Sequence, residues 1–375
     1  MKNISVLIKP ASSLCNMRCH YCFYADITAR RNVKSYGIMK TETAENLIKN
    51  ILVDSEDFGQ VTFAFQGGEP TLAGLPFFEF FVQVVQAEVK ALNRKVNINY
   101  AFQTNGLVLN DEWCEFFKKN RFLVGLSLDG NATMHNENRV DAKGKGTYSR
   151  IMAAKQCLEK HSVEYNILWV LTSQHARYPQ KIWNFLIKNS IKYVQFIPCL
   201  SELNSEERTI EALTPERFAK FYIGLFQQWK SEMEKGNYIS VKFFDDLFNL
   251  LMDKTVTACG LTGHCQQHFV VEADGSVYPC DFYTLDSWRV GNFNDQTVGE
   301  IATTDHMKSF IIRKNTRSTK CGSCTWVNMC GGGCPRMKDN MYLTEDEKYC
   351  GYEEFLNVCS NDIQFMASKL YRNRF

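Results

Sequence analysis

Three cysteines, Cys15, Cys19 and Cys22, lie within eight residues near the start of the chain, in the stretch CNMRCHYC. Thiolates at this density favour a soft metal site, with an iron–sulfur cluster, zinc or copper(I). The alternative is a cysteine-lined core stripe, since positions i, i+4 and i+7 share one helix face, but the turn-prone residues 11–13 and Asn16 favour a loop. Because structural zinc takes four ligands, the loop is one ligand short for zinc and would leave one metal position of a cluster open.

A second and larger group of cysteines lies toward the C-terminus. Its eight members are Cys259, Cys265, Cys280, Cys321, Cys324, Cys330, Cys334 and Cys350. Eight thiolates would suit two fully ligated iron–sulfur clusters or two zinc sites of four cysteines each, and spacing alone does not decide between them. By contrast, Cys114, Cys157 and Cys199 stand singly among apolar residues, so we expect them to be small core residues.

The elements that must position these thiols alternate regularly over the first 200 residues. Runs rich in β-branched and aromatic residues predict six strands, at 4–10, 61–67, 96–104, 122–130, 165–173 and 193–199. Apolar periodicity predicts five helices between them, at 43–54, 76–92, 111–120, 148–161 and 179–189. This alternation indicates an α/β protein with βαβ units and a parallel sheet. Six units are fewer than the eight of a closed barrel, so an open partial barrel and a doubly wound sheet both fit.

In either fold the ligand site lies at the carboxyl ends of the strands. The polar segments FQGGEP, QTNG and SLDG follow the second, third and fourth predicted strands, and the cysteine loop follows the first. The chemistry-bearing residues are therefore expected at one edge of the sheet.

The regular alternation stops near residue 205. Thr214 as N-cap, Pro215 in the first turn and Gly236 at the end bound one long predicted helix. The chain then becomes rich in Gly, Cys and short turns, without a further β/α period. We therefore predict two domains, at residues 1–235 and 236–375.

Charge and hydropathy indicate which partners and which cellular location to expect. Forty-three Lys and Arg against 41 Asp and Glu leave a formal charge of +2, which gives no global field for nucleic acid or for an anionic membrane. We expect neither partner. No secretory signal and no membrane-spanning apolar run are visible, so we expect a cytoplasmic location and thiols that serve metals or catalysis rather than disulfides.

The cysteine loop, with Tyr21 before its last cysteine, resembles the signature of the radical S-adenosylmethionine (SAM) enzymes. The resemblance implies a partial (β/α)6 barrel, like an incomplete TIM barrel. It also implies a 4Fe–4S cluster on the three loop cysteines, whose open iron binds SAM and whose electron cleaves it to a 5′-deoxyadenosyl radical. The SAM-binding residues that it implies are Gly67, Gly68, Glu69 and Pro70 of the GGEP segment, with Asn105, Ser127 and Arg139.

The C-terminal cysteine pattern resembles the SPASM extension, a small iron–sulfur domain. By this resemblance, one auxiliary 4Fe–4S cluster is ligated by Cys259, Cys265, Cys280 and Cys334. The other is ligated by Cys321, Cys324, Cys330 and Cys350. We therefore expect three 4Fe–4S clusters, two of them in a SPASM domain that ends in a C-terminal helix.

The segments RNVKSYGIM, FAFQGGEPTLAG, FLVGLSLDG and FVVEADGSVYPCDFY resemble the anaerobic sulfatase-maturating enzymes, and the similarity runs through nearly the whole chain. That family oxidises a Cys or Ser in a Cys/Ser-x-Pro-x-Arg motif of a sulfatase to Cα-formylglycine. The side chain loses a hydrogen atom from Cβ, then one proton and one electron, and with cysteine the resulting thioaldehyde is hydrolysed to the aldehyde. The resemblance implies that Asp281 is the base and that Tyr24 and Gln66 line the substrate pocket.

The resemblance also implies partners. We expect an unfolded or nascent sulfatase polypeptide as substrate, a flavodoxin or ferredoxin as electron donor, and a monomeric enzyme.

Three alternative functions remain open at this point. Another SPASM maturase would form thioethers, epimers or crosslinks in a peptide. A zinc-binding interaction protein would hold zinc without iron, and a ferredoxin-like electron carrier would need no barrel.

Overall fold

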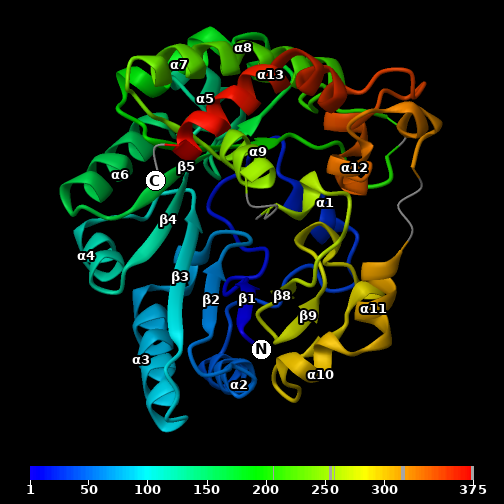
Figure 1. Ribbon diagram of the computed structural model, residues 1–375. Coiled ribbons are helices and arrows are strands. Elements are labelled where there is room, and N and C mark those ends of the chain that lie inside the picture. Colours follow the sequence, from blue (N-terminus) through cyan, green and yellow to red (C-terminus); the bar gives the residue numbers. More distant parts are fainter. Residues whose placement is uncertain (206, 253–255, 257, 314–316, 373–375) are drawn as a thin grey trace. The chain divides into compact units, whose positions relative to one another are not determined.

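The computed structural model describes residues 1–205, 207–252, 256, 258–313 and 317–372, which divide into two units (Figure 1). The first unit comprises Met1–Leu128, His135–Tyr165 and Gln267–Arg313. The second comprises Asp129–Met134, Asn166–Gln266 and Lys314–Phe375. Both units therefore combine segments that are far apart in the sequence. None of the described helices is both long enough and apolar enough to cross a membrane.

A largely parallel sheet forms the centre of the first unit, in the strand order β10-β9-β8-β1-β2-β3-β4. Its strands are β1 (Asn3–Ile8), β2 (Gln60–Phe65), β3 (Asn97–Thr104), β4 (Phe122–Ser127), β8 (Phe269–Val271), β9 (Ser276–Tyr278) and β10 (Gly291–Asn292). Ile8 of β1 pairs with Phe65 of β2 on one side and with Val271 of β8 on the other. Because these three strands are parallel, the residues that follow them leave the sheet at the same edge.

Helices cover this sheet and supply its core. They are α1 (Phe23–Ala29), α2 (Thr41–Leu52), α3 (Leu75–Ala91), α4 (Asp111–Lys119), α6 (Tyr148–Lys160), α10 (Val298–Ala302) and α11 (Asp305–Ile312). Helix α5 (Ala132–Asn138) is divided between the two units, with its last four residues in the first. Phe65 of β2 meets Phe78 and Phe81 of α3 edge-on, with ring centroids 5.1 and 5.0 Å apart. Each such aromatic pair stabilises the core by about 0.5–1.5 kcal/mol beyond the area it buries.

The second unit has three parallel strands, in the order β5-β6-β7. They are β5 (Tyr165–Leu171), β6 (Tyr193–Pro198) and β7 (Ser240–Val241). Its helices are α7 (Pro179–Lys188), α8 (Pro215–Glu234), α9 (Lys242–Met252), α12 (Val327–Cys330) and α13 (Gly351–Arg372). Helices α8 and α9 meet through Tyr222 and Phe243, whose ring centroids are 4.3 Å apart. The C-terminal helix α13 packs on α8.

The six predicted strands and five predicted helices are confirmed, as β1–β6 and α2, α3, α4, α6 and α7. The long predicted helix is α8, and the hydroxyl of Thr214 accepts a hydrogen bond from Arg217 N at its start. Strands β1 to β4 follow each other in the sheet without the reversal that a doubly wound sheet requires. The α/β fold with a partial barrel is therefore the correct choice.

One strand of the sheet comes from outside the alternating region. In the turn-rich region after α9, for which no further β/α period was expected, β8 pairs with β1 in parallel. This strand has only three residues, all of them buried, which is too short for a periodic pattern to reveal. Its place next to β1 brings the residues that follow it to the site described below.

Candidate functional site

Asp281 lies in a polar network of the first unit, and its side chain is 18% exposed. Its Oδ2 accepts hydrogen bonds from the Tyr24 hydroxyl, at 2.6 Å, and from Gln66 Nε2, at 2.9 Å. Gln66 Nε2 also lies 3.0 Å from the Tyr24 hydroxyl oxygen. The structure thus brings together the predicted base and the two predicted substrate-pocket residues.

The local structure explains how these side chains are held. Gln66 is the first residue after β2, and Asp281 opens a short 3-10 helix, η4 (Asp281–Tyr283), which contacts α1. Tyr24 lies in the first turn of α1. Burial and the adjacent Asp281 carboxylate raise the pKa of Tyr24 well above its ordinary value. The phenol therefore stays protonated and donates to Oδ2.

Sequence reasoning missed Lys9, which is the first residue after β1 and is only 2% exposed. Its Nζ lies 3.0 Å from Asp281 Oδ1, an ion pair without the alignment of a hydrogen bond. The same ammonium lies 3.7 Å from Glu272 Oε1 and 4.8 Å from the centre of the Tyr24 ring. In the sequence, the only sign that Lys9 belongs to the site was its position as a charged residue at the end of an apolar strand.

Glu272 was missed as well, although it directly follows β8. It is buried, and it accepts hydrogen bonds from the Ser12 hydroxyl, at 2.7 Å, and from the Arg31 guanidinium. Burial raises the pKa of Glu272, but Lys9 and Arg31 outweigh this effect and hold the pKa below its ordinary value. Two buried cations, Lys9 and Arg31, therefore face two carboxylates, Glu272 and Asp281, and the charges balance.

The register of the sheet accounts for this gathering. Ile8, Phe65 and Val271 are aligned across β1, β2 and β8. Lys9, Gln66 and Glu272 each follow one of these residues. Parallel alignment therefore places a cation, an amide and a carboxylate side by side at the carboxyl edge of the sheet.

Glu69 of the GGEP segment is fully occupied at one oxygen. Its Oε1 accepts from the amide and hydroxyl of Thr71, at 3.1 and 2.7 Å, and from the Thr104 hydroxyl, at 2.8 Å. Its Oε2 accepts from Asn105 N at 2.8 Å. Burial raises the pKa of Glu69, and these hydrogen bonds oppose that rise. Since each carboxylate oxygen offers about two acceptor sites, only Oε2 keeps capacity for a further donor.

The glycines of this segment allow it to approach the chain that leads into the cysteine loop. Gly68 N donates to Ser12 O at 2.9 Å, and Glu69 N donates to Leu14 O at 2.7 Å. A Cβ at Gly68 would lie only 2.1 Å from Leu14 O. The adjacent Gly67 has φ +115°, which other residues rarely adopt. Close packing against the cysteine loop is thus a structural task of these glycines.

Other segments hold the cysteine loop from its remaining sides. Arg18 N donates to Val140 O at 2.8 Å, and His20 N donates to Asn138 O at 3.0 Å. Asn105 Nδ2 donates to Asn16 Oδ1 at 2.7 Å. The loop is therefore fixed by hydrogen bonds before any metal is considered.

The first loop cysteine lies in a largely buried environment. Burial and the nearby Glu69 carboxylate raise the pKa of Cys15, against the opposing effect of Met17 N, to about 11. A thiolate at this position needs a compensating positive charge, which a bound metal provides. The loop thus fits the iron–sulfur group that its spacing predicts.

The remaining predicted SAM residues are Arg139, Ser127 and Pro70. Arg139 is buried, and its guanidinium lies 5.5 Å from the centre of the Tyr21 ring. In the sequence, Tyr21 stands between the second and third loop cysteines. Ser127 ends β4, and Pro70 begins the short helix η1 (Pro70–Ala73). Their roles stay predictions.

We expect the replacement of Gly68 by alanine to displace the backbone next to Leu14 and so to disturb the cysteine loop. Overpacking of this kind lowers stability by about 1–3 kcal/mol. The clash here is with a backbone atom, which cannot change rotamer to relieve it. Iron bound by the first cluster should fall in anaerobically reconstituted protein. Gly322→Ala is the matched control, because a Cβ there would meet nothing within 4 Å although Gly322 neighbours a cluster cysteine. Unchanged iron in Gly68→Ala would contradict the packing role.

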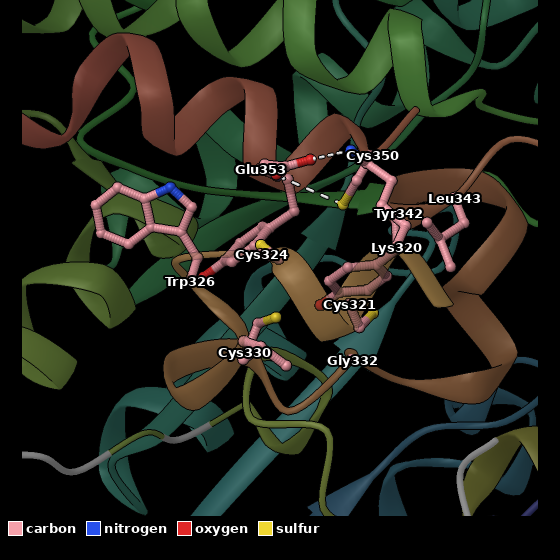
Figure 2. A pocket seen from close by; sticks show the side chains of 12 residues that line it. Lys320, Cys321, Cys324, Trp326, Cys330, Gly332, Tyr342, Leu343, Cys350 and Glu353 are labelled. Carbon is pink, nitrogen blue, oxygen red and sulfur yellow. Dashed lines mark hydrogen bonds and ion pairs between the residues drawn. The ribbon is translucent and has the colours of Figure 1, made fainter. Parts of the chain in front are cut away.

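One group of C-terminal cysteines lines a single pocket in the second unit (Figure 2). These cysteines are Cys321, Cys324, Cys330 and Cys350, the four predicted to share one auxiliary cluster. Tyr342 and Tyr352 form part of the wall. Burial raises the pKa of Cys350 to about 11, and the amides of Glu353 and Tyr352 oppose the rise. Four converging thiols fit a fully ligated metal group.

The rim of this pocket carries an ion pair. Lys320 Nζ lies 2.7 Å from Glu353 Oε2, and Glu353 N donates to Cys350 Sγ at 3.5 Å (Figure 2). Such amide-to-sulfur hydrogen bonds are one means by which a protein sets the potential of a cluster.

The other predicted cysteine set is divided between the units. Cys259, Cys265 and Cys334 belong to the second unit, and Cys280 belongs to the first. Burial, together with the neighbouring Cys334 and Cys265, raises the pKa of Cys259 to about 11. The Tyr342 hydroxyl, which belongs to the other cysteine pocket, donates to Gly260 O at 2.7 Å. Three of the four cysteines thus lie together, and the contribution of Cys280 stays a prediction.

Comparisons with known proteins agree with this geometry. The family profile of the Radical SAM superfamily matches residues 10–186, and the SPASM profile, an iron–sulfur cluster-binding domain, matches residues 259–325. The chain is 39% identical to the cysteine-type anaerobic sulfatase-maturating enzyme of Clostridium novyi, over 99% of both chains. It is 42% identical to the enzyme of the same name from Clostridium perfringens, over 96% of this chain and 100% of that one.

A solved structure is similar over almost the same length. It is native anSMEcpe with bound AdoMet and Cp18Cys peptide, at a TM-score of 0.89 and 39% sequence identity. The match covers 98% of this chain and 99% of the other. Similarity in both sequence and structure therefore extends across both units rather than over one motif.

Proposed function

This chain belongs to the anaerobic sulfatase-maturating enzymes, which are radical SAM enzymes with a SPASM domain, and we propose that it oxidises a cysteine of a sulfatase polypeptide to Cα-formylglycine. It is thus an enzyme whose cofactors are SAM and 4Fe–4S clusters. A zinc-binding interaction protein and a simple electron carrier are excluded as classes. The observation that carries the proposal is Asp281, held beside Tyr24 and Gln66 in a chain similar to these enzymes over its whole length.

The cofactor-binding residues are proposed as follows. Cys15, Cys19 and Cys22 hold the first cluster, and the remaining capacity of Glu69 Oε2 suits the ammonium group of SAM. The other proposed SAM contacts are Gly67, Gly68, Pro70, Asn105, Ser127 and Arg139. When bound, SAM and this cluster supply a radical that takes one hydrogen atom from the target Cβ, and the auxiliary clusters supply an acceptor for one electron.

Asp281 takes the proton that the substrate must lose. Tyr24 and Gln66 both donate to Oδ2. Oδ1 forms the ion pair with Lys9 Nζ, at 3.0 Å, but accepts no hydrogen bond from the residues that the structure describes. Oδ1 is therefore the oxygen that we assign to the substrate thiol. A base must lie within about 2.6–3.2 Å of the proton that it removes, so the two donors to Oδ2 serve to aim Oδ1.

Lys9 and Glu272 position this carboxylate. Lys9 lies 3.0 Å from Asp281 Oδ1 and is itself fixed by Glu272 and by the Thr284 hydroxyl, at 3.7 and 3.4 Å. Glu272 and Asp281 together balance the charges of Lys9 and Arg31.

Three clusters are proposed in total. The pocket of Cys321, Cys324, Cys330 and Cys350 would hold one auxiliary cluster, and Cys259, Cys265, Cys280 and Cys334 the other. We place the boundary between the barrel (1–235) and the SPASM region (236–375) near residue 235. The two family profiles, which end at residue 186 and begin at residue 259, lie on either side of it.

We propose cysteine rather than serine as the target because the two relatives named above are cysteine-type enzymes, at 39% and 42% identity. A peptide substrate also fits the solved relative, which was determined with a peptide bound. An unfolded or nascent sulfatase is the natural source of such a peptide. The reducing partner, a flavodoxin or ferredoxin, and the monomeric state stay predictions from the resemblance.

The test compares peptides that differ only at the target residue. The anaerobically reconstituted enzyme, with SAM and a strong reductant, should convert a Cys-x-Pro-x-Arg peptide to its aldehyde faster than the Ser-x-Pro-x-Arg peptide. Mass spectrometry would follow 5′-deoxyadenosine and a carbonyl-reactive product, with an Ala-x-Pro-x-Arg peptide as control. SAM cleavage with both peptides left unmodified would point to another SPASM maturase. A faster reaction of the serine peptide would overturn the cysteine assignment alone.

A further inference from the structure

Helices α4 and α6 of the first unit, which pack on each other (Figure 1), bring together a second set of metal-binding side chains. Asp111 and Cys114 are three residues apart on α4, and Cys157 and His161 are four apart on and just after α6. Residues at these spacings share one helix face. The donor atoms of Asp111, Cys157 and His161 all lie within 4.8 Å of one another.

Cys114 lies beside this set and approaches it through Cys157. Its Sγ lies 3.2 Å from Cys157 Sγ. Asp111 Oδ1 lies 2.6 Å from His161 Nε2 and 3.5 Å from Cys157 Sγ. Zn–S bonds of about 2.3 Å and Zn–N bonds of about 2.0–2.1 Å place tetrahedral ligands roughly 3.3–3.8 Å apart. To surround one ion, Asp111 Oδ1 and His161 Nε2 would have to move apart from 2.6 Å, and Cys114 Sγ would have to turn toward both of them.

Cys157 was expected to be a core residue like Cys114 and Cys199. Cys199, at 1% exposure, fits this expectation, whereas Cys114 is fully buried but has its sulfur next to that of Cys157. Cys157 is only half-buried, and its sulfur faces a carboxylate and an imidazole. An apolar filling role does not explain these polar neighbours.

From this geometry we propose that Asp111, Cys114, Cys157 and His161 bind one zinc ion, separate from the iron–sulfur sites. Two thiolates, one imidazole and one carboxylate form a donor set that suits zinc. With both thiols deprotonated, three negative ligand charges exceed the two positive charges of the ion by one. Lys160 Nζ, 2.8 Å from Asp111 Oδ1, can neutralise the excess. Asp111 Oδ2 can take over this ion pair when Oδ1 binds the metal.

The ion would brace α4 against α6. Among the described contacts, Lys118 Nζ also joins these elements by donating to Ser162 O, at 2.8 Å. A four-coordinate site with no open position is typical of structural zinc. The proposed role is therefore structural and does not depend on the radical reaction.

The test uses the complete enzyme with its clusters loaded. The protein is incubated with zinc chloride, desalted anaerobically and analysed for zinc and iron. Wild type should retain about one zinc ion per chain, and X-ray absorption at the zinc edge should show two sulfur and two lighter ligands. Asp111→Asn and His161→Gln should lose most of this zinc with unchanged iron. Glu112→Gln, which also removes an acidic side chain from the first turn of α4, should retain it.

Three outcomes would overturn the proposal. One is wild-type protein that retains no zinc. Another is zinc with an all-sulfur shell, which would place the ion in a vacated cluster site. The third is zinc that persists equally in Asp111→Asn and His161→Gln. The X-ray measurement on wild type decides the matter even if a variant folds poorly.

Discussion

Replacing Asp281 by asparagine should leave the cleavage of SAM intact and lower formylglycine formation by about 10²–10⁴-fold, the usual contribution of a positioned base. The asparagine oxygen can still accept from Tyr24 and Gln66, which both donate to Asp281 Oδ2. The amide that replaces Oδ1 cannot accept the substrate proton, however. The amide hydrogens of the new asparagine would also face the Lys9 ammonium, which in wild type lies 3.0 Å from Asp281 Oδ1. Hydrogen-atom abstraction precedes this step and should continue.

The measurement follows 5′-deoxyadenosine and aldehyde in the same reaction with the Cys-x-Pro-x-Arg peptide. In wild type the two products should rise together, and in Asp281→Asn only the first should rise. Asp295→Asn is the matched control, because this aspartate is exposed and lies in the same unit. Full aldehyde formation by Asp281→Asn would remove the role of base. Parallel loss of 5′-deoxyadenosine would instead indicate a defect in cofactor binding.

Replacing Glu272 by glutamine should lower the free energy of local opening around β1 and β8 by about 3–5 kcal/mol, the effect of removing one partner of a buried ion pair. Arg31 would lose its carboxylate partner while its NH2 group already lacks a hydrogen bond. Lys9 would keep only Asp281. At 1.36 kcal/mol per tenfold change, amide hydrogen exchange in β1 and β8 should accelerate by about 10²–10³-fold or more.

Exchange is measured by mass spectrometry on cluster-loaded protein, with Glu79→Gln as control, since Glu79 is exposed on α3. The difference between wild type and Glu272→Gln should depend on pH. Although burial raises the pKa of Glu272, Lys9 and Arg31 hold it below the ordinary value of 4.5. The stabilisation is thus complete above pH 4.5 and is lost as the pH falls through the lower, folded-state pKa. Equal exchange in both proteins at neutral pH would show that the network adds no stability.

The amino-acid sequence was sufficient for features that depend on local spacing. Alternating apolar patterns predicted β1–β6 and the helices between them, because the spacing of apolar residues and the length of each segment can be read from that segment alone. The two cysteine-rich regions could be recognised for the same reason, whereas the division of the second into two sets of four came from the resemblance. Cys321, Cys324 and Cys330 lie within ten residues and do line one pocket. Tyr24, Gln66 and Asp281 came from resemblance alone, since nothing local connects residues 24 and 281.

Only the tertiary structure decided which charges face each other. Arg31 and Glu272 are 241 positions apart, and Lys9 meets Glu272 because the three-residue strand β8 pairs with β1. Cys157 looked like an ordinary core residue until α4 and α6 packed together. Spacing along the chain is thus enough to identify ligands that share a loop. Ion pairs and ligand sets drawn from separate elements depend on strand register and helix packing, because these fix the distances over which charges and metal bonds act.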